Sequence, residues 1–284
     1  MVAVVISTRW PQSWLIHATI ILYLLHRKYS VALLLLSMHK KIPVTPDSMR
    51  CSTCMLSEFC LSFGLSMSEL EQLDALVQER IRLPKNSTLF QLGDPADAIY
   101  ALRSGSLKTQ LEDASGHVQI TSFLLPGEIA GIDGLQTDIH RSHAIALEDS
   151  EVCVMRMNDF DRLAAEMPVL QTQLRRLMSQ EIARSHNLMK TLGALRSEQR
   201  LAAFLLNLSE RLSALGYSPY EFILRMSREE IGNFLGLTLE TVSRLFSRFA
   251  REGLLKIQQR EVMLLDLDAL RELSGVECAA EHPK

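Results

Sequence analysis

The spacing of hydrophobic and polar residues along this chain changes its period once, after about Met157. Between Leu83 and Met157, short apolar runs alternate with turn residues, which is typical of β-strands. The expected strands are Thr88–Leu92, Ala98–Ser104, Leu107–Glu112, Val118–Leu125, His143–Leu147 and Glu151–Met157. Many short strands at near-regular spacing favour a sandwich or roll over alternating strand–helix units.

The following segment has a helical period. From Pro168 to Leu195 apolar residues recur in steps of three and four, with Glu181 and Ser185 as the weak positions. This pattern predicts one long helix with a coiled-coil-like seam, although a helix packed only on its own domain would also show it. We expect a homodimer seam. Its candidate residues are Leu174, Leu177, Met178, Ile182, Ser185, Met189 and Leu192.

After a second helix, from about Ser197 to Ala214, the chain has the signals of a helix-turn-helix motif. Ser227 and Glu230 have the spacing of a capping box, and Gly236 can end the short helix that they open. Thr238 can cap a further helix that continues to about Arg251. The runs Leu254–Ile257 and Val262–Asp266 then predict a hairpin of the size of a wing. The alternative is an ordinary pair of amphipathic helices.

The helix after Thr238 divides into two faces. Val242, Leu245, Phe246 and Phe249 would anchor it to the domain core, and the opposite face is polar. On that face Arg244 can bind guanine O6 and N7, Glu240 can accept from cytosine N4, and Ser243 can reach a base or a phosphate. The candidate DNA contacts are Thr238, Glu240, Thr241, Ser243, Arg244, Ser247, Arg248 and, in the wing, Lys256.

Composition adds little to this picture. The 284 residues suffice for two domains, and the net charge of −3 is not that of a strongly basic nucleic-acid binder. Residues 225–260, however, hold seven Lys or Arg against four Glu, a local balance of +3. We find no glycine-rich phosphate loop, His-x-Glu metal pattern or nucleophile elbow, so we do not expect an enzyme.

The first 48 residues are treated apart. Their two apolar runs, Trp14–Leu25 and Val31–Leu36, are separated by His26-Arg27-Lys28, and neither approaches the roughly 20 residues of a membrane-spanning helix. No small-residue cleavage site follows cleanly, as a signal peptide would require. We expect an upstream extension, with translation starting at Met38 or Met49, and the alternative is a poorly packed tail. We therefore expect a cytoplasmic protein without a membrane partner.

Three of the five cysteines, Cys51, Cys54 and Cys60, lie within ten residues. Together with one cysteine from a strand they could hold a metal centre, and their spacing leaves zinc and an iron–sulfur cluster equally open. A disulfide is disfavoured in a reducing compartment. Cys153, between Val152 and Val154, would by itself be a core thiol. Cys278, in the polar tail, has no assigned role.

The pattern Cys51-x2-Cys54-x5-Cys60, the distant Cys153 and the run from Ile231 to Arg244 resemble one family. It is the cyclic-AMP receptor protein superfamily, specifically its fumarate-and-nitrate-reduction branch of anaerobic regulators, over about residues 50–273. The resemblance implies an α+β fold with an N-terminal β-roll (jelly-roll) sensor domain, a long dimerisation helix and a C-terminal winged helix-turn-helix. The corresponding limits are 49–164, 165–195 and 196–276, with an extension at 1–48 and a tail at 277–284.

The resemblance also implies a function. Cys51, Cys54, Cys60 and Cys153 would hold a [4Fe–4S] cluster, and the protein would be an oxygen-responsive transcription regulator that dimerises under low oxygen. It would bind palindromic double-stranded DNA and would act through RNA polymerase. It would be an activator, with activation or repression at each gene left open. Members of the family often have an Asp on the seam where this chain has Ser185.

Two rival interpretations stay within the same superfamily. Gly127-Glu128 and Arg141-Ser142 are similar to the phosphate-binding residues of its cyclic-AMP branch, although the segment between them differs. A haem-based gas sensor is the other rival. His117, His140 and His143 lie in loop-like or strand-edge stretches without convincing metal-ligand spacing, so we expect them at the surface. The sequence does not identify the target genes or the sensitivity to oxygen.

Overall fold

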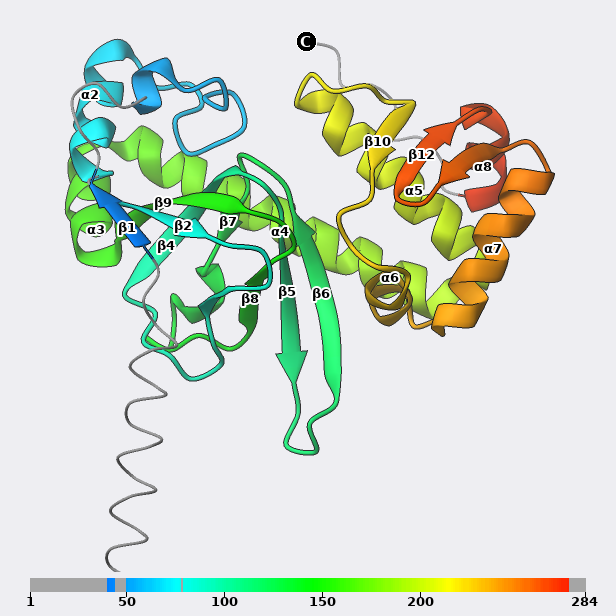
Figure 1. Ribbon diagram of the computed structural model, residues 1–284. Helices are drawn as coiled ribbons and strands as arrows, with labels where there is room; N and C mark the ends of the chain where they lie inside the picture. The colour runs from blue at the N-terminus through cyan, green and yellow to red at the C-terminus, as the bar shows by residue number, and fades with distance from the viewer. Residues whose placement is uncertain (1–39, 44–49, 78, 276–284) are drawn as a thin grey trace, which may run out of the picture. The chain divides into compact units, whose positions relative to one another are not determined.

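The first half of the chain folds into two β-sheets (Figure 1). The computed structural model describes residues 40–43, 50–77 and 79–275, so the expectations about Met38, Met49 and Cys278 concern residues outside these ranges. The strand orders are β1-β2-β9-β4-β7 and β3-β8-β5-β6. The strands are β1 (Lys40–Pro43), β2 (Glu79–Leu83), β3 (Thr88–Phe90), β4 (Ala98–Ser104), β5 (Leu107–Glu112), β6 (Val118–Leu124), β7 (Ile129–Ala130), β8 (His143–Ala146) and β9 (Ser150–Arg156).

The six strands predicted from alternation are all present within two residues of the expected ends. They pack a shared core, which includes Leu102, Leu107, Ala144 and Val152, each at most 1% exposed. β1, β2 and β7 were not predicted, and β1 lies within the segment 1–48 that was expected to be an extension. β2 was missed because its sequence Glu-Arg-Ile-Arg-Leu carries three charges, one of which belongs to the buried Arg80.

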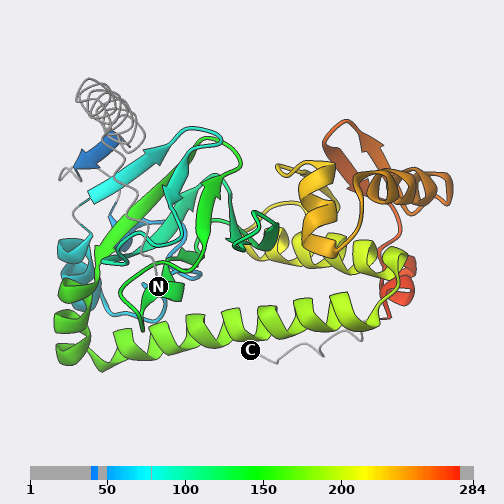
Figure 2. The same cartoon turned by 90° about the horizontal axis from the view of Figure 1, so that it is seen from below.

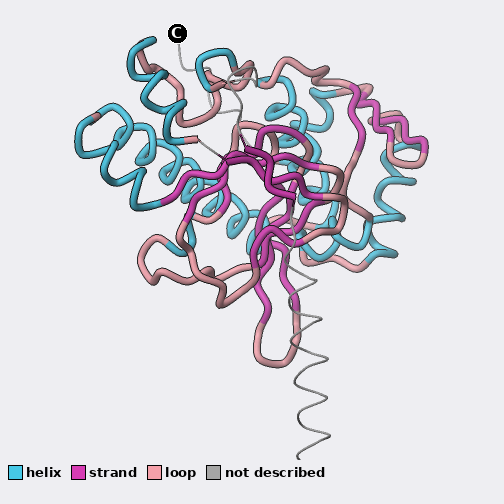
Figure 3. The backbone as a smooth tube through the Cα atoms, turned by 60° about the vertical axis from the view of Figure 1, so that its left-hand side comes forward, coloured by secondary structure: helices cyan, strands magenta, loops and turns pink. Residues whose placement is uncertain are grey.

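The remaining elements are mainly helical (Figure 3). They are η1 (Cys51–Thr53), α2 (Met67–Leu76), η2 (Ile132–Gly134), α3 (Met157–Glu166), α4 (Pro168–Ala194), α5 (Ser197–Ala214), β10 (Glu221–Ile223), α6 (Arg228–Leu235), α7 (Leu239–Arg251), β11 (Leu255–Gln258), β12 (Glu261–Leu264) and α8 (Leu267–Ser274). No helix among the described residues is long and apolar enough to cross a membrane.

Helix α4 is the long helix that the heptad-like pattern predicts, and it begins at Pro168, whose fixed φ suits a first helical position (Figure 2). Its apolar residues serve two surfaces. Leu170 and Leu177 are buried in a cluster with Leu61 from the cysteine-bearing segment. Met178, Ile182 and Met189 are 37%, 55% and 61% exposed. Leu177 therefore faces its own sensor domain, so the predicted seam has to be formed by the remaining candidates.

The C-terminal domain confirms the capping signals. The Ser227 hydroxyl accepts from the backbone N–H of Glu230, and the Glu230 carboxylate accepts from the N–H of Ser227. Gly236 ends α6 in the left-handed conformation, with φ at 62°. The Thr238 hydroxyl then caps α7 by accepting from the N–H of Thr241. β11 and β12 form the predicted hairpin, and the unpredicted β10 adds a third strand beside β12.

The turn between α6 and α7 depends on Gly232. A Cβ at this position would lie 2.6 Å from the carbonyl oxygen of Leu237, which is a backbone atom and cannot rotate away. We therefore expect Gly232→Ala to destabilise the C-terminal domain by about 1–3 kcal/mol, the usual range for an overpacked site. The measurement is urea unfolding followed by circular dichroism.

Gly193→Ala is the matched control, because nothing lies within 4 Å of a Cβ at that helical position. It should leave the free energy of unfolding unchanged or raise it by up to about 1 kcal/mol, since Ala is the better helix former. Equal stability of the two variants would contradict the packing argument.

Candidate metal centre and DNA-binding surface

The four predicted cysteine ligands come from two distant segments of the chain. Cys51 opens η1, Cys54 and Cys60 lie in the turns that follow it, and Cys153 lies in the middle of β9. All four are free and partly buried. The Asp74 carboxylate holds the start of this segment by accepting from the N–H of Cys51 and from the Ser52 hydroxyl. The fold thus brings the four sequence-predicted thiols to one region.

The four thiols are close enough for their charges to interact. Burial raises the pKa of Cys51, and negative charge on Cys60, Cys153 and Cys54 would raise it further. Burial likewise raises the pKa of Cys60 to about 12, and Cys153 and Cys54 contribute in the same direction. Without a cation Cys51 and Cys60 therefore stay protonated at neutral pH. A bound metal would supply the positive charge that lets them ionise.

Two arginines, Arg80 and Arg103, lie near Cys153 on the strands that flank β9. Burial raises the pKa of Cys153, and the positive charges of Arg80 and Arg103 lower it. Arg80 lies directly opposite Cys153 in the pairing of β2 with β9. Arg103 lies where the register of β4 against β9 shifts between Leu102 and Ser104, and such irregularities commonly redirect a side chain. Both guanidiniums also pair with the Glu151 carboxylate.

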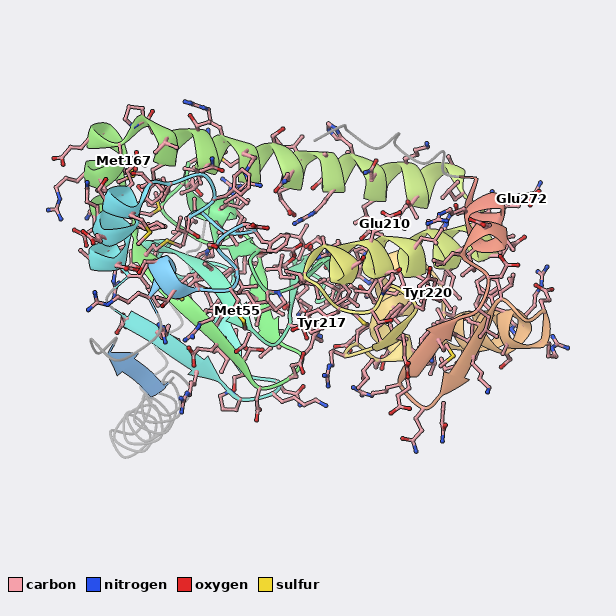
Figure 4. All side chains as sticks on the ribbon, turned by 90° about the horizontal axis from the view of Figure 1, so that it is seen from above. Met55, Met167, Glu210, Tyr217, Tyr220 and Glu272 are labelled. Carbon is pink, nitrogen blue, oxygen red and sulfur yellow. The ribbon has the colours of Figure 1, made fainter. Side chains whose placement is uncertain are left out.

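Four thiols are a donor set that suits an iron–sulfur cluster as well as a single zinc ion. Within the described ranges, no group of three or more His, Cys, Asp or Glu side chains is placed to hold one metal ion. A cluster needs more widely spaced thiolates, because each of them binds a different iron. It also carries net negative charge with four thiolates, which the neighbouring Arg80 and Arg103 would offset. Met55, next to Cys54, is 85% exposed, so this segment lies at the protein surface (Figure 4).

The Gly127-Glu128 pair, expected in a nucleotide pocket under the rival interpretation, is engaged within the protein. Both carboxylate oxygens of Glu128 are bonded: Arg184 of α4 lies 2.8 Å from Oε1, and Arg211 of α5 lies 2.6 Å from Oε2. Gly127 contacts the cysteine-bearing segment so closely that a Cβ there would lie 2.7 Å from the Cβ of Phe59. Glu128 therefore links the sensor sheet to α4 and to the first helix of the C-terminal domain.

The two faces of α7 are as the sequence predicts. Val242, Leu245, Phe246 and Phe249 are all less than 9% exposed, and they lie in the core of the C-terminal domain. The exposed predicted contacts are Thr238, Glu240, Ser243, Arg244, Ser247, Arg248 and Lys256, whereas Thr241 is half-buried. A helix with one anchored and one polar face is what docking in a major groove requires.

Some side chains on the polar face of α7 bond to neighbouring residues of the protein, and others are more available to DNA. Thr238 caps α7, and its hydroxyl lies 3.1 Å from that of Thr241. A bond from its own backbone N–H and one from the Thr238 hydroxyl lower the pKa of Glu240, so this carboxylate is ionised at neutral pH. Arg248 pairs with Glu252 at 2.7 Å, and the Arg244 guanidinium contacts the Thr241 hydroxyl at 3.3 Å. Arg244 thus has the freer cationic group of the two.

The helix-turn-helix is held to the sensor domain at the edge strand β6. The Asn233 side chain donates to the carbonyl of Val118 at 2.7 Å and accepts from the N–H of Ile120 at 2.6 Å. These are the bonds that a further strand would make to an unpaired sheet edge. Lys108 of β5 adds an ion pair with Glu230 at 2.9 Å. The orientation of α6 therefore depends on the sensor sheet.

The predicted seam residues are distributed along α4 as follows. Met178, Ile182, Ser185 and Met189 are exposed, and Leu174 and Leu192 are half-buried. The exposed residues follow heptad-like spacing along one side of the helix. An apolar stripe of this kind suits a second copy of the helix.

Sequence reasoning missed Asp74, Arg80, Arg103, Arg176 and Asn233. Each acts on a partner far along the chain: Asn233, for instance, is 115 residues from Val118. No local spacing indicates such a contact. A buried arginine on a strand, as at Arg80, is visible only once the register is known.

Comparisons with known proteins agree with this architecture. Residues 80–167 match the model of the cyclic nucleotide-binding domain, and residues 199–273 match that of the Crp-like helix-turn-helix domain. The transcriptional regulatory protein btr of Bordetella pertussis is 61% identical over 240 residues, covering 84% of this chain and 99% of that protein. The fumarate and nitrate reduction regulatory protein of Escherichia coli K12 is 41% identical, covering 80% of this chain and 91% of that protein.

Among solved structures, FixK2 from Bradyrhizobium japonicum aligns with a TM-score of 0.65 and 28% identity, covering 70% of this chain and 98% of that one. The predicted fold class is thereby confirmed: a β-sheet sensor domain, a long helix and a C-terminal helix-turn-helix. Relatives named as transcription regulators also agree with the expectation of a non-enzyme. The chain belongs to the Crp/Fnr family of DNA-binding transcription regulators.

Proposed function

We propose that this regulator is an oxygen-responsive one, in which a [4Fe–4S] cluster held by Cys51, Cys54, Cys60 and Cys153 promotes dimerisation and DNA binding under low oxygen. The observation that carries the proposal is the meeting of these four partly buried thiols from two segments, with arginines beside them. The relatives named anaerobic regulatory protein, 42% identical over 236 residues in Haemophilus influenzae, support it.

Each residue of the site has a defined part in holding the group. The four cysteines supply thiolates, Asp74 fixes the backbone at Cys51, and Arg80 and Arg103 provide positive charge beside Cys153. When bound, such a cluster supplies iron and sulfide that oxygen can attack. The exposed position of Met55 beside Cys54 supports this role, because dissolved oxygen would reach that end of the site.

The cysteine-bearing segment contacts the dimerisation helix directly. The Arg176 guanidinium donates to the carbonyl oxygen of Cys60 at 3.3 Å and lies 4.8 Å from the ring centre of Phe63. Leu61, which follows Cys60 in the chain, is fully buried and packs in the same cluster as Leu177. Ordering this segment would therefore order α4 immediately before the exposed stripe that begins at Met178.

Dimerisation would couple the sensor to DNA. Two recognition helices in a symmetric dimer can enter successive major grooves of a palindromic site, and one alone loses most of that affinity. The linkage is thermodynamic, because whatever favours the dimer favours the bound state. The same proposal includes contact between this regulator and RNA polymerase at promoters that the regulator activates. It also includes a cytoplasmic location.

A cyclic-nucleotide-responsive regulator is the second candidate, and the match of residues 80–167 to the nucleotide-binding domain favours it. The bonds of Glu128 argue against it, since a ligand would have to displace two arginines.

The central test is anaerobic purification with quantification of iron and sulfide. We expect about four of each per chain and a broad visible absorbance band, both lost in air. Replacing any one of Cys51, Cys54, Cys60 or Cys153 with Ser should abolish them, because one missing thiolate leaves an iron open to water. Cys278→Ser is the control and should change nothing. A full cluster in Cys153→Ser would show that the fourth ligand is misassigned.

Arg244→Ala should weaken binding to the specific site by about 1–3 kcal/mol and flatten the preference at one base pair of each half-site. Lys256→Ala should weaken all sequences alike and reduce the salt dependence, because a wing lysine suits a phosphate contact. The measurement is titration of all single-base operator variants. An unchanged ranking of these variants by Arg244→Ala would refute the recognition model.

Ser185 should make the cluster-free protein more dimeric than a relative with Asp at this position. Two facing carboxylates repel in a partly desolvated seam, and an exposed serine on α4 removes that repulsion. We expect sedimentation of cluster-free protein at micromolar concentration to show more dimer for the wild type than for Ser185→Asp. Ala183→Asp, an exposed position outside the predicted seam, should behave as the wild type. Equal, fully monomeric wild type and Ser185→Asp would contradict the prediction.

A further inference from the structure

One carboxylate lies at the centre of three hydrogen-bond donors in the turn between β7 and β8. Asp133 Oδ2 accepts from the backbone N–H of Arg141 at 2.9 Å and from the Ser142 hydroxyl at 2.7 Å. Asp133 Oδ1 lies 3.2 Å from Nδ1 of His140. Three donors from consecutive residues converging on two oxygens form the kind of concave seat that binds an oxyanion.

The seat is rigid and largely buried. His140 is fully buried, against our expectation of a surface position, and its ring stacks on Phe90 with a centroid distance of 3.6 Å. Ser142 is 8% exposed. On the other side, Gly131 has a φ of 90° and leads into η2, which carries Asp133. A Cβ on Gly134 would lie 2.2 Å from that of Ala96, so the backbone of η2 packs directly against Ala96.

The Asp133 carboxylate is ionised in this environment. Burial alone would raise its pKa, but the bonds from His140, Ser142 and Arg141 outweigh that effect and lower it. The stabilisation from these bonds is present above the ordinary carboxyl pKa of about 4 and is lost as the pH falls through the lower folded value. At neutral pH the seat therefore already contains a full negative charge.

A carboxylate and a phosphate compete for the same donors, since both present anionic oxygens to N–H and O–H groups. We infer that Asp133 is an internal anion, and that it is the residue that keeps this sensor domain from binding phosphate, whether free or in the phosphodiester of a cyclic nucleotide. The two sources share one chemistry at this seat. The inference does not depend on the metal centre, because the three donors belong to residues 140–142 and bond to Asp133 and not to a cysteine.

The rest of the matched nucleotide-binding region agrees with a seat that the chain fills by itself. Glu128, which lies in the same matched region, is held by Arg184 and Arg211, and Phe59 packs closely against Gly127. The protein therefore replaces the two polar contacts of a ligand with contacts to its own side chains. Asp133 supplies the carboxylate that occupies the three donors, so a single substitution at this position would free them.

The test compares the full-length chain with Asp133→Ala by thermal unfolding and by isothermal titration. The titrants are inorganic phosphate and cyclic AMP, with chloride at matched ionic strength as the reference. We expect neither titrant to bind the wild type, whereas Asp133→Ala should bind inorganic phosphate at least about tenfold more tightly, with a raised unfolding midpoint in phosphate. Asp138→Asn removes an exposed charge from the same loop and should behave as the wild type.

Each outcome decides the matter. Binding of cyclic AMP only by Asp133→Ala would extend the seat to the phosphodiester, and binding of phosphate alone would limit it to small oxyanions. Binding of either titrant by the wild type as tightly as by Asp133→Ala would overturn the inference, and so would a folded Asp133→Ala that binds neither titrant. If Asp133→Ala fails to fold in chloride, recovery of folding in phosphate supports the seat, and failure in both salts overturns it.

Discussion

The arrangement of this regulator depends on the two ion pairs of the Glu128 carboxylate, with Arg184 and with Arg211. This carboxylate lies in the sensor domain, is 14% exposed, and binds arginines from the long helix and from the first helix of the C-terminal domain. A charge so little hydrated is stable only while its partners stay in place. The three elements are therefore constrained together, because a displacement of α4 would break the Arg184 bond that helps to hold Glu128 in place for Arg211 of α5.

In the cysteine region, the positive charges of two arginines lie near Cys153. Burial raises the pKa of Cys51, Cys60 and Cys153, because a thiolate at these positions is poorly hydrated and would be repelled by negative charge on the neighbouring thiols. Arg80 and Arg103 reduce that cost on the Cys153 side, yet both are also held by Glu151, which keeps the guanidiniums from being unpaired when the thiols are neutral. The region can thus exist with or without negative charge on sulfur, which a reversible metal centre requires.

The sequence predicted those parts of the molecule that local spacing determines. Strand alternation, the capping box at Ser227, the N-cap at Thr238 and the two faces of α7 depend on residues a few positions apart, and the structure shows all of them. Contacts across the fold were not predictable in this way. The partners of Glu128 are 56 and 83 positions away along the chain, and the burial of His140 follows from stacking on Phe90, 50 positions earlier.

The long helix shows how two signals can share one pattern. Its apolar period was interpreted as a single seam, but Leu177 packs on the cysteine-bearing segment while Met178, the next residue, is exposed on another side of the helix. Consecutive helical residues point about 100° apart, so the sensor contact and the predicted dimer surface lie on neighbouring sides of the same turn. A change in the packing of Leu61 against Leu177 therefore needs only to rotate or order that turn to reach the partner-facing side. The cysteine-bearing segment and the predicted dimer surface are therefore separated by the width of one helix, and the proposed coupling needs no longer relay.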